Sequence, residues 1–477
     1  MRRTLFAFSA LALAGGCDPG EFGSALDRAP VQVVGAPSGF ESSLGADVGR
    51  TLLPMLPPVD RPKMAARLLF AATHAPGLAV ADFDGNGKAQ VKAAASEDLE
   101  KLGLGSIQDS SQEGISSAAW LSAPTPAGTV VLGMPNVATS PGQGAVAFLK
   151  LGVDAGGNPD FETAGQSPRF GLSAETHFGL AVAPGRVTQA AADEVIALSD
   201  RGVHVLGFPS GEVISASSCT VALPTPSDSH RSLAVADFLP DGDGGGKQEI
   251  AVGLPNQDAT GPGRVVILQY ASGAAALSCP IELSVPGGAS PGFGTALAAV
   301  PDLNGDGKAE LVVGAPPDRA YLFLSPFNLT PPKMLVFSGD AASQFGQRVA
   351  LVDVDGDGNK ELAVTALQAD VGSTKAAGQV SMYKLDYTLD AAGNPVVVNS
   401  NAIAVVNDSN PISKTEFFGI GLAELEFNNS SPICAKGRDA HLLVVGADAG
   451  IFTFFSFAGT AVPTKAIAPD PRCFAQK

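Results

Sequence analysis

The chain reads Asp302-Leu-Asn304-Gly-Asp306-Gly-Lys308-Ala-Glu310 at one place and Asp353-Val-Asp355-Gly-Asp357-Gly-Asn359-Lys-Glu361 at a second. Both stretches put oxygen-bearing side chains at loop positions 1, 3, 5 and 9, with glycine at positions 4 and 6. Ca²⁺ takes about six to eight oxygen ligands, and glycine lets a short loop turn tightly enough to aim alternate residues at one ion. The spacing therefore predicts two calcium loops.

These loops are predicted to join strands. An EF-hand loop ends on a glutamate at its twelfth position and connects two helices, but here Val313 and Val364 occupy that position within Leu-Val-Val and Leu-Ala-Val runs. Runs of this kind bounded by glycine and aspartate are typical of β-strands. The predicted ligands are the side chains of Asp302, Asn304, Asp306, Glu310, Asp353, Asp355, Asp357 and Glu361, with the main-chain carbonyls of Lys308 and Asn359.

The sequence around the two loops repeats as well. Phe293-Gly294 precedes the first loop and Gly314-Ala315-Pro316 follows it, while Phe345-Gly346 and Thr365-Ala366 frame the second. This arrangement resembles the FG-GAP repeat, the blade of the β-propeller best known from integrin alpha chains and found in many bacterial envelope proteins. The resemblance implies that calcium stiffens the loop between a blade's first two strands and takes no part in chemistry.

Two weaker copies of the loop are present. One, after Leu233-Ala-Val-Ala-Asp237, is longer, and the other, after Leu78-Ala-Val-Ala-Asp82, keeps the spacing but ends in glutamine. The residues predicted to bind calcium there are Asp237, Asp241, Asp243 and Glu249 in the first, and Asp82, Asp84, Asn86, Lys88 through its carbonyl, and Gln90 in the second. Calcium is thus expected at two sites and at up to four.

Three further units are predicted from their strand runs. Phe178-Gly179 and Phe418-Gly419 begin two of them, and Val130-Val-Leu-Gly133 belongs to the third. Small sheets must cover one another's faces, and radial closure leaves only short, protected edges. The expected fold is an all-β β-propeller with seven blades of four antiparallel strands over residues 77–477. Segment 31–76, which begins with another GAP-like run, is either a degenerate blade or a strand that closes the ring.

The first residues predict export. Met1-Arg2-Arg3 is followed by an apolar stretch up to Ala14 that is too short to span a bilayer, as in a secretory signal. Gly15-Gly16-Cys17 resembles the end of a bacterial lipobox, although Ala14 stands where that pattern usually has leucine. We expect a lipoprotein signal peptide at 1–16, a lipid on Cys17 and a linker at 17–30. Ordinary cleavage after Ala12-Leu13-Ala14 is the alternative.

The cysteine count agrees with that assignment. The chain has five cysteines, and giving Cys17 to the lipid leaves an even number, as disulfides in an exported protein require. The pairing Cys434 with Cys473 is favoured because both belong to the last unit. Cys219 with Cys279 is the second candidate pair.

The net charge of −17 argues against nucleic acid as a partner and leaves the lipid anchor as the only membrane contact. The five histidines occur singly, and neither a metalloprotease nor a nucleophile-elbow motif is present. The resemblance implies an adhesion or protein or glycan interaction scaffold at the bacterial cell envelope, in the outer membrane, facing the periplasm or at the cell surface. Two alternatives stay open: a lyase or hydrolase with a site at the propeller mouth, and a purely structural envelope component.

Overall fold

Short apolar runs separated by Gly, Pro, Asn and Asp form strands in nearly every described part of the chain. A computed structural model describes residues 32–35, 50–55, 64–72, 77–84, 89–93, 114–121, 128–136, 144–153, 159–163, 169–170, 177–188, 193–208, 213–216, 232–240, 247–256, 261–271, 276–285, 290–353, 359–398, 400–407, 417–427, 440–447 and 450–455. The helical element in these residues is the short 3-10 turn η2 (Ala341–Ser343), which Asp340 caps.

The strands form small antiparallel sheets, which we number as blades in chain order. Blade 1 holds β2 (Thr51–Met55), β3 (Met64–Ala72), β4 (Gly77–Asp84) and β5 (Ala89–Ala93). Blade 2 holds β6 (Ser117–Leu121), β7 (Thr129–Met134), β8 (Ala145–Val153), β9 (Pro159–Thr163) and β10 (Arg169–Phe170). Blade 3 holds β11 (Val182–Gly185), β12 (Glu194–Leu198), β13 (Val203–Leu206) and β14 (Val213–Ala216).

The remaining blades follow the same order. Blade 4 holds β15 (Leu233–Ala236), β16 (Glu249–Leu254), β17 (Arg264–Ala271) and β18 (Ala276–Leu283). Blade 5 holds β19 (Ala296–Val300), β20 (Glu310–Ala315), β21 (Arg319–Phe323) and β22 (Met334–Ser338). Blade 6 holds β23 (Phe345–Val352), β24 (Glu361–Ala366), β25 (Gln379–Tyr383) and β28 (Ala404–Val406), and blade 7 holds β29 (Gly421–Phe427), β30 (Ala440–Ala447), β31 (Gly450–Phe455) and β1 (Gln32–Gly35).

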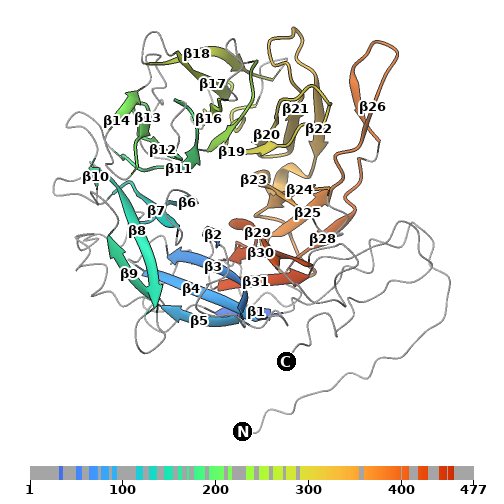
Figure 1. Ribbon diagram of the computed structural model, residues 1–477. Coiled ribbons are helices and arrows are strands. Elements are labelled where there is room, and N and C mark those ends of the chain that lie inside the picture. The colour runs from blue at the N-terminus through green and yellow to red at the C-terminus, as the bar shows by residue number, and fades with distance from the viewer. Residues whose placement is uncertain are drawn as a thin grey trace, which may run out of the picture.

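The blades stand around a common axis, with the first strand of each blade at the centre (Figure 1). Contacts pass from β2 to β6, β11, β15, β19, β23 and β29, and from β29 back to β2, so the innermost strands form a closed circuit. The prediction of an all-β propeller is therefore confirmed. In the described residues six sheets have four strands, but both β9 and β10 pair with β8, so blade 2 does not have the expected four.

The ring is closed by strands from the two ends of the chain. β1 is the outermost strand of blade 7, where Gln32 lies opposite Thr453. Of the two alternatives for segment 31–76, the closing strand is right for β1. The boundary at residue 77 is wrong, because β2 and β3 pair with β4 and so belong to blade 1.

The Phe-Gly pairs that begin the repeats explain how blades pack. Phe178, Phe293, Phe345 and Phe418 are all buried, and the glycine after each has a φ between 92° and 100°. Phe293 belongs to a core cluster built from blades 4 and 5, and Phe345 to one built from blades 5 and 6. Each of these two phenylalanines therefore packs between neighbouring blades, as the repeat alignment requires.

The glycine of the GAP-like strand end has a matching role. A Cβ on Gly253 would lie 2.0 Å from the carbonyl oxygen of Gly294 in the next blade, and a Cβ on Gly314 would lie 2.3 Å from that of Gly346. Any larger residue would push the blades apart. The GAP-like strand end of one blade thus contacts the Phe-Gly pair of the next blade.

Candidate calcium loops

The loop of blade 5 connects the first two strands of its blade, as the spacing predicts. Gly305 and Gly307 both have a φ of 82°, which strains any residue with a side chain. The Asp302 carboxylate accepts hydrogen bonds from the N–H groups of Gly305 at 2.7 Å, Asp306 at 3.1 Å and Gly307 at 2.8 Å. One carboxylate thus holds the loop in a tight turn.

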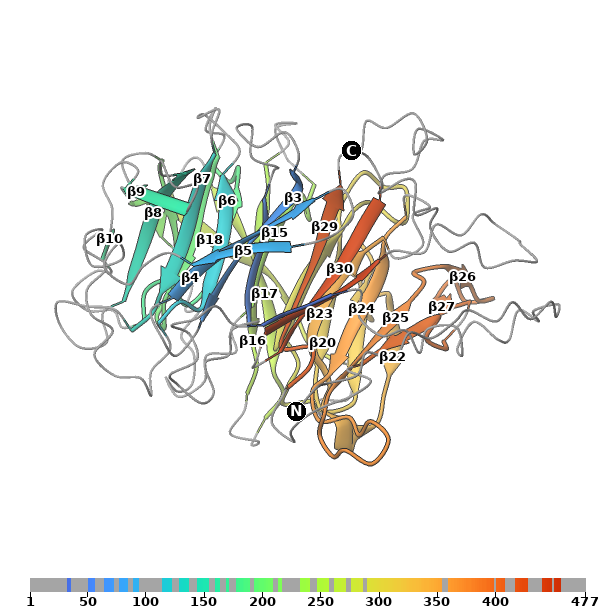
Figure 2. The same ribbon diagram turned by 90° about the horizontal axis from the view of Figure 1, so that it is seen from below.

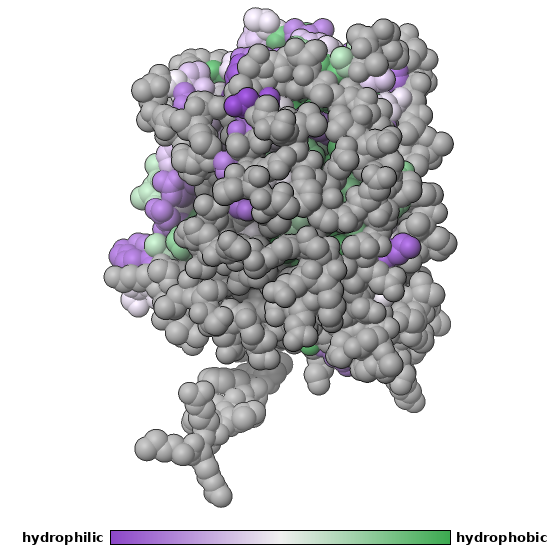
Figure 3. Space-filling view, turned by 90° about the vertical axis from the view of Figure 1, so that its left-hand side faces the viewer, coloured by the Kyte–Doolittle hydropathy of each residue, from purple (hydrophilic) through white to green (hydrophobic). Residues whose placement is uncertain are grey.

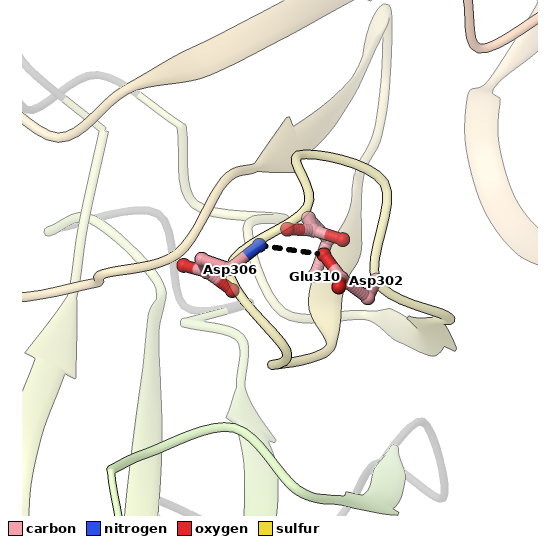
Figure 4. Close-up of side chains that lie close together, drawn as sticks. All are labelled: Asp302, Asp306 and Glu310. Carbon is pink, nitrogen blue, oxygen red and sulfur yellow. Dashed lines mark hydrogen bonds between the residues drawn. The ribbon is translucent and has the colours of Figure 1, made fainter.

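Three carboxylates gather in this loop (Figure 4). One oxygen each of Asp302, Asp306 and Glu310 lie within 4.8 Å of one another. Two oxygens on one Ca²⁺ can be at most about 5 Å apart, because each Ca–O distance is about 2.3 to 2.6 Å. The arrangement of these three side chains therefore fits one calcium ion.

Ser325, just after β21, contacts the same group. Its hydroxyl lies 2.6 Å from Asp306 Oδ2 and 3.2 Å from Glu310 Oε1, and it can donate to only one of them at a time. Asn304 Nδ2 donates to the Ser325 carbonyl at 2.9 Å, while Asn304 Oδ1 accepts the Asp306 N–H at 2.9 Å. Ser325 was not predicted, because no spacing rule within the loop points to a serine on the far side of two strands.

Glu310 is buried at the start of β20, and its burial raises the pKa of its carboxyl to about 7. A hydrogen bond from the Leu303 N–H at 2.6 Å and the Ser325 hydroxyl oppose this rise, while the negative charges of Asp306 and Asp302 add to it. A divalent cation among the three carboxylates would favour the ionised form instead. The carboxylates of this loop repel one another when ionised, and a bound cation would offset that repulsion.

The loop of blade 6 is described only at its two ends. Asp353 and Glu361 are both buried, whereas Asp355 and Asp357 lie outside the described residues and Asn359 is exposed. Glu424 of blade 7 accepts the Asp353 N–H at 2.8 Å and pairs with Lys360 at 2.6 Å. The loop is therefore tied to the next blade, and calcium binding there stays a prediction.

The loop of blade 4 is also described only at its ends. Asp241 and Asp243 lie outside the described residues. Asp237 pairs at 2.6 Å with Lys308 of blade 5, so the Lys308 side chain joins two blades while its carbonyl remains the predicted ligand. Glu249 is buried and accepts the N–H groups of Phe238 at 2.8 Å and Leu239 at 2.9 Å.

The Asp82–Gln90 loop does not have the predicted place in its blade. It connects β4 to β5, the third and fourth strands, because β2 and β3 precede them. Asp82 is buried and holds Arg67 of β3 through bonds of 2.6 and 3.1 Å, and the exposed Gln90 lies opposite it in the sheet. Asn86 and Lys88 lie outside the described residues, and only the backbone of Asp84 is described. Asp82 therefore already has a cationic partner.

A buried glutamate at the first residue of the second strand recurs from blade to blade. Glu194, Glu249, Glu310 and Glu361 are between 0% and 2% exposed. Glu194 accepts the N–H groups of Val187 at 2.7 Å and Thr188 at 2.9 Å, although the rest of its loop lacks the calcium pattern. The glutamate therefore anchors the loop backbone whether or not a metal binds. Glu194 was not predicted, but the Glu-Val-Ile run that it begins is the signal that marks it.

Other predicted positions lie mostly outside the described residues. These are Cys17, Cys219, Cys434 and Cys473. Cys279 of β18 is disulfide-bonded, but its partner is not among the described residues, so the pairing with Cys219 stays a prediction. No helix in the described part of the chain is long and apolar enough to cross a membrane.

The described residues contain little that resembles a catalytic site. The carboxylates of the blade 5 loop are the one grouping of His, Cys, Asp or Glu with metal-ligand spacing found in this part of the chain. His204 is buried in β13 against Phe178, with ring centroids 5.6 Å apart. Glu424, on an innermost strand, is bonded to Lys360.

Comparison with known proteins agrees with this geometry. The family model for the FG-GAP repeat matches residues 293–323 and 345–383, which cover the first three strands and the candidate calcium loops of blades 5 and 6. These two blades are FG-GAP repeats. Human integrin alpha-IIb is 35% identical to this chain over 102 residues, a match that covers 18% of this chain and 10% of the integrin. The chain thus spans only a small part of the length of that relative.

Solved structures give a looser likeness. Sqt1 from Chaetomium thermophilum is 14% identical with a TM-score of 0.45, over 85% of this chain and 82% of its own. The structure titled BBS1N in complex with ARL6DN is 10% identical with a TM-score of 0.45, over 90% of this chain and 98% of that chain. Scores this low say nothing about function.

Proposed function

We propose that this FG-GAP propeller is an exported protein, anchored by a lipid on Cys17, that binds structural calcium and serves as an adhesion or protein or glycan interaction scaffold at the bacterial cell envelope. The observation that supports it best is the convergence of Asp302, Asp306 and Glu310 within 4.8 Å in a blade that matches the FG-GAP model. FG-GAP propellers of the integrin type are generally not enzymes, and the described residues offer no catalytic cluster.

In blade 5 the ion would be held by Asp302, Asn304, Asp306, Glu310 and the Lys308 carbonyl. The second site would use Asp353, Asp355, Asp357, Glu361 and the Asn359 carbonyl. Both loops join the first two strands of their blades and both contact a neighbouring blade. Calcium there would replace repulsion between carboxylates with attraction and would stiffen the junction between blades. Its role is structural.

The calcium part is tested by isothermal titration of the chelated, full-length mature protein. We expect at least two sites, of which Asp302→Asn with Asp306→Asn removes one. Asp318→Asn with Asp370→Asn removes the same charge from blades 5 and 6 outside the loops and should leave binding unchanged. Titration of the wild-type protein without heat at any calcium concentration up to the millimolar range would refute calcium binding.

The anchor is tested separately by expressing the full precursor in a Gram-negative host. We expect the protein in the membrane fraction and Cys17→Ser in the soluble fraction, because a diacylated cysteine is the only membrane contact proposed. Mass spectrometry should find a mature N-terminus at Cys17. A mature end at Gly15 would instead support ordinary cleavage after Ala14.

A further inference from the structure

Blade 6 carries an insertion that is not found in any other sheet of the described residues. Between β25 and β28 the chain forms a hairpin of β26 (Tyr387–Leu389) and β27 (Pro395–Val397). The hairpin, called the arm below, projects away from the ring (Figure 1 and Figure 2). Its base is fixed, because β27 lies beside β22 of blade 5, and Tyr387 and Val397 pack against the core between blades 5 and 6.

The tip of the arm is an ordered turn. The Asp390 carboxylate accepts the N–H groups of Ala392 and Asn394, each at 2.8 Å, and the Asn394 side-chain amide at 3.2 Å. These bonds lower the pKa of Asp390, so its carboxylate is charged at neutral pH. The arm therefore presents a fixed shape and a fixed negative charge.

The arm also exposes apolar side chains. Leu389, Val396 and Val398 are 59%, 48% and 60% exposed, and Leu329 of blade 5, at 37%, is the other large apolar residue exposed in the described part. On the side of the molecule away from the arm, the residues that are coloured in Figure 3 include both hydrophilic and hydrophobic ones. A two-stranded hairpin is only marginally stable by itself, and exposed apolar groups gathered on one element mark interaction sites.

The pairing within the arm shows which main-chain groups point outward along β26, an edge that pairs with no other strand among the described residues. The bonds Val398 N–H to Asp386 O at 3.1 Å and Asp390 N–H to Asn394 O at 2.8 Å define alternate hydrogen-bonded pairs. In an antiparallel ladder the residues between such pairs point their main-chain groups outward, so the groups of Tyr387 and Leu389 face away from β27. The opposite edge is blocked, since Pro395 has no N–H and β22 lies beside β27.

The side chains along that free edge set the charge of a partner. Asp386, Thr388 and Asp390 are all exposed, and alternation places them on one face of the strand. A strand added to this edge would set its own alternate side chains against an Asp-Thr-Asp row. A second copy of this edge would place aspartate opposite aspartate, which is destabilising.

We propose that β26 is a docking edge for an extended polypeptide segment with basic side chains two residues on either side of a β-branched residue. Main-chain hydrogen bonds to Tyr387 and Leu389 would hold the segment, and its two basic side chains would face Asp386 and Asp390. Its β-branched side chain would lie beside Thr388, on the face of the arm that also carries Val396 and Val398. Such a segment would be the partner of the proposed interaction scaffold. The inference rests on the proposed function only in naming that partner.

The test uses the full-length mature protein and a fluorescein-labelled peptide, Thr-Lys-Thr-Val-Thr-Lys-Thr, followed by anisotropy. Thr-Thr-Lys-Lys-Val-Thr-Thr has the same composition but the wrong alternation, and Thr-Lys-Thr-Val-Pro-Lys-Thr loses one N–H. Both should bind at least about fivefold more weakly, the change expected from about 1 kcal/mol of cross-strand pairing. Asp386→Lys should weaken binding of the first peptide by a similar factor and strengthen binding of its glutamate counterpart, Thr-Glu-Thr-Val-Thr-Glu-Thr.

Asp318→Lys changes the overall charge equally on blade 5, away from the arm, and should have no such effect. Equal binding of the two lysine isomers, or equal weakening by Asp386→Lys and Asp318→Lys, would show a non-specific charge effect and overturn the proposal. A protein dimer that Leu389→Pro dissolves, through loss of an outward N–H on β26, would assign the edge to a second copy and would also overturn it. Because calcium binding is measured separately, failure here leaves the calcium scaffold untouched.

Discussion

The loops of blades 3 and 5 both join the first two strands of their blades, yet their described residues are charged differently. In blade 3, Glu194 holds the N–H groups of Val187 and Thr188, and the nearby acid Asp193 is paired with Arg186 at 3.0 Å. In blade 5, Glu310 holds the Leu303 N–H and faces two further carboxylates. The glutamate belongs to the loops of blades 3 to 6, whereas the three converging carboxylates of blade 5 are the feature from which we propose calcium binding.

The largest effect should come from what the two blades share. Phe178 and Phe293 are both buried at the start of their blades, so Phe178→Ala and Phe293→Ala should each lower the free energy of unfolding by about 3 to 5 kcal/mol. The loss should be the same in excess calcium and in chelator, because both rings lie in hydrophobic cores between blades. Urea unfolding in both buffers measures it. A loss below about 1 kcal/mol for either variant would break the equivalence of the two blades.

Removing calcium should distinguish blade 5 from blade 3. An ion present at 100 times its Kd adds about 2.7 kcal/mol to the free energy of unfolding, so chelation should lower the melting temperature of the wild-type protein. Asp302→Asn with Asp306→Asn should remove the share due to blade 5, whereas Arg186→Gln with Asp193→Asn in blade 3 should leave the response intact. Scanning calorimetry gives the comparison, and a chelation response equal in both double variants would contradict it.

The same comparison shows what the sequence could reveal. The Phe-Gly pairs and the two full loops predicted blades 5 and 6, because their residues are neighbours in the chain. Asp82 matches the same spacing, but it lies on the third strand of its blade. It pairs with Arg67 of β3, and no local sequence pattern indicates that pairing. Ser325 and Glu194 were missed for a related reason: one reaches the loop from another strand, and the other keeps only one residue of the motif.

A smaller effect should follow from neutralising the shared glutamate. Glu194→Gln replaces a charged acceptor of two N–H bonds by a neutral one and should cost about 1 to 2 kcal/mol with or without calcium. Glu310→Gln should cost less than this in chelator, because the Glu310 carboxyl with its pKa near 7 is already partly neutral there. In calcium it should cost more, because a ligand is lost. If both variants respond alike to chelation, the two glutamates have the same role and the comparison fails.

The smallest expected effect is the dependence of stability on pH in chelator. The pKa of Glu310 is raised to about 7 in the folded protein, so the folded state holds this proton more tightly than the unfolded chain. The stability from that proton is fully present below about pH 4.5 and is lost as pH rises through 7. Between pH 6 and 7.5 the melting temperature of chelated protein should therefore fall by about 1 to 2 °C from this group.

Glu310→Gln should abolish the fall, and Glu194→Gln should keep it. In saturating calcium the fall should vanish, because the bound ion keeps the Glu310 carboxylate ionised throughout this pH range. Parallel pH profiles for wild type and Glu310→Gln in chelator would mean that Glu310 does not titrate in this range.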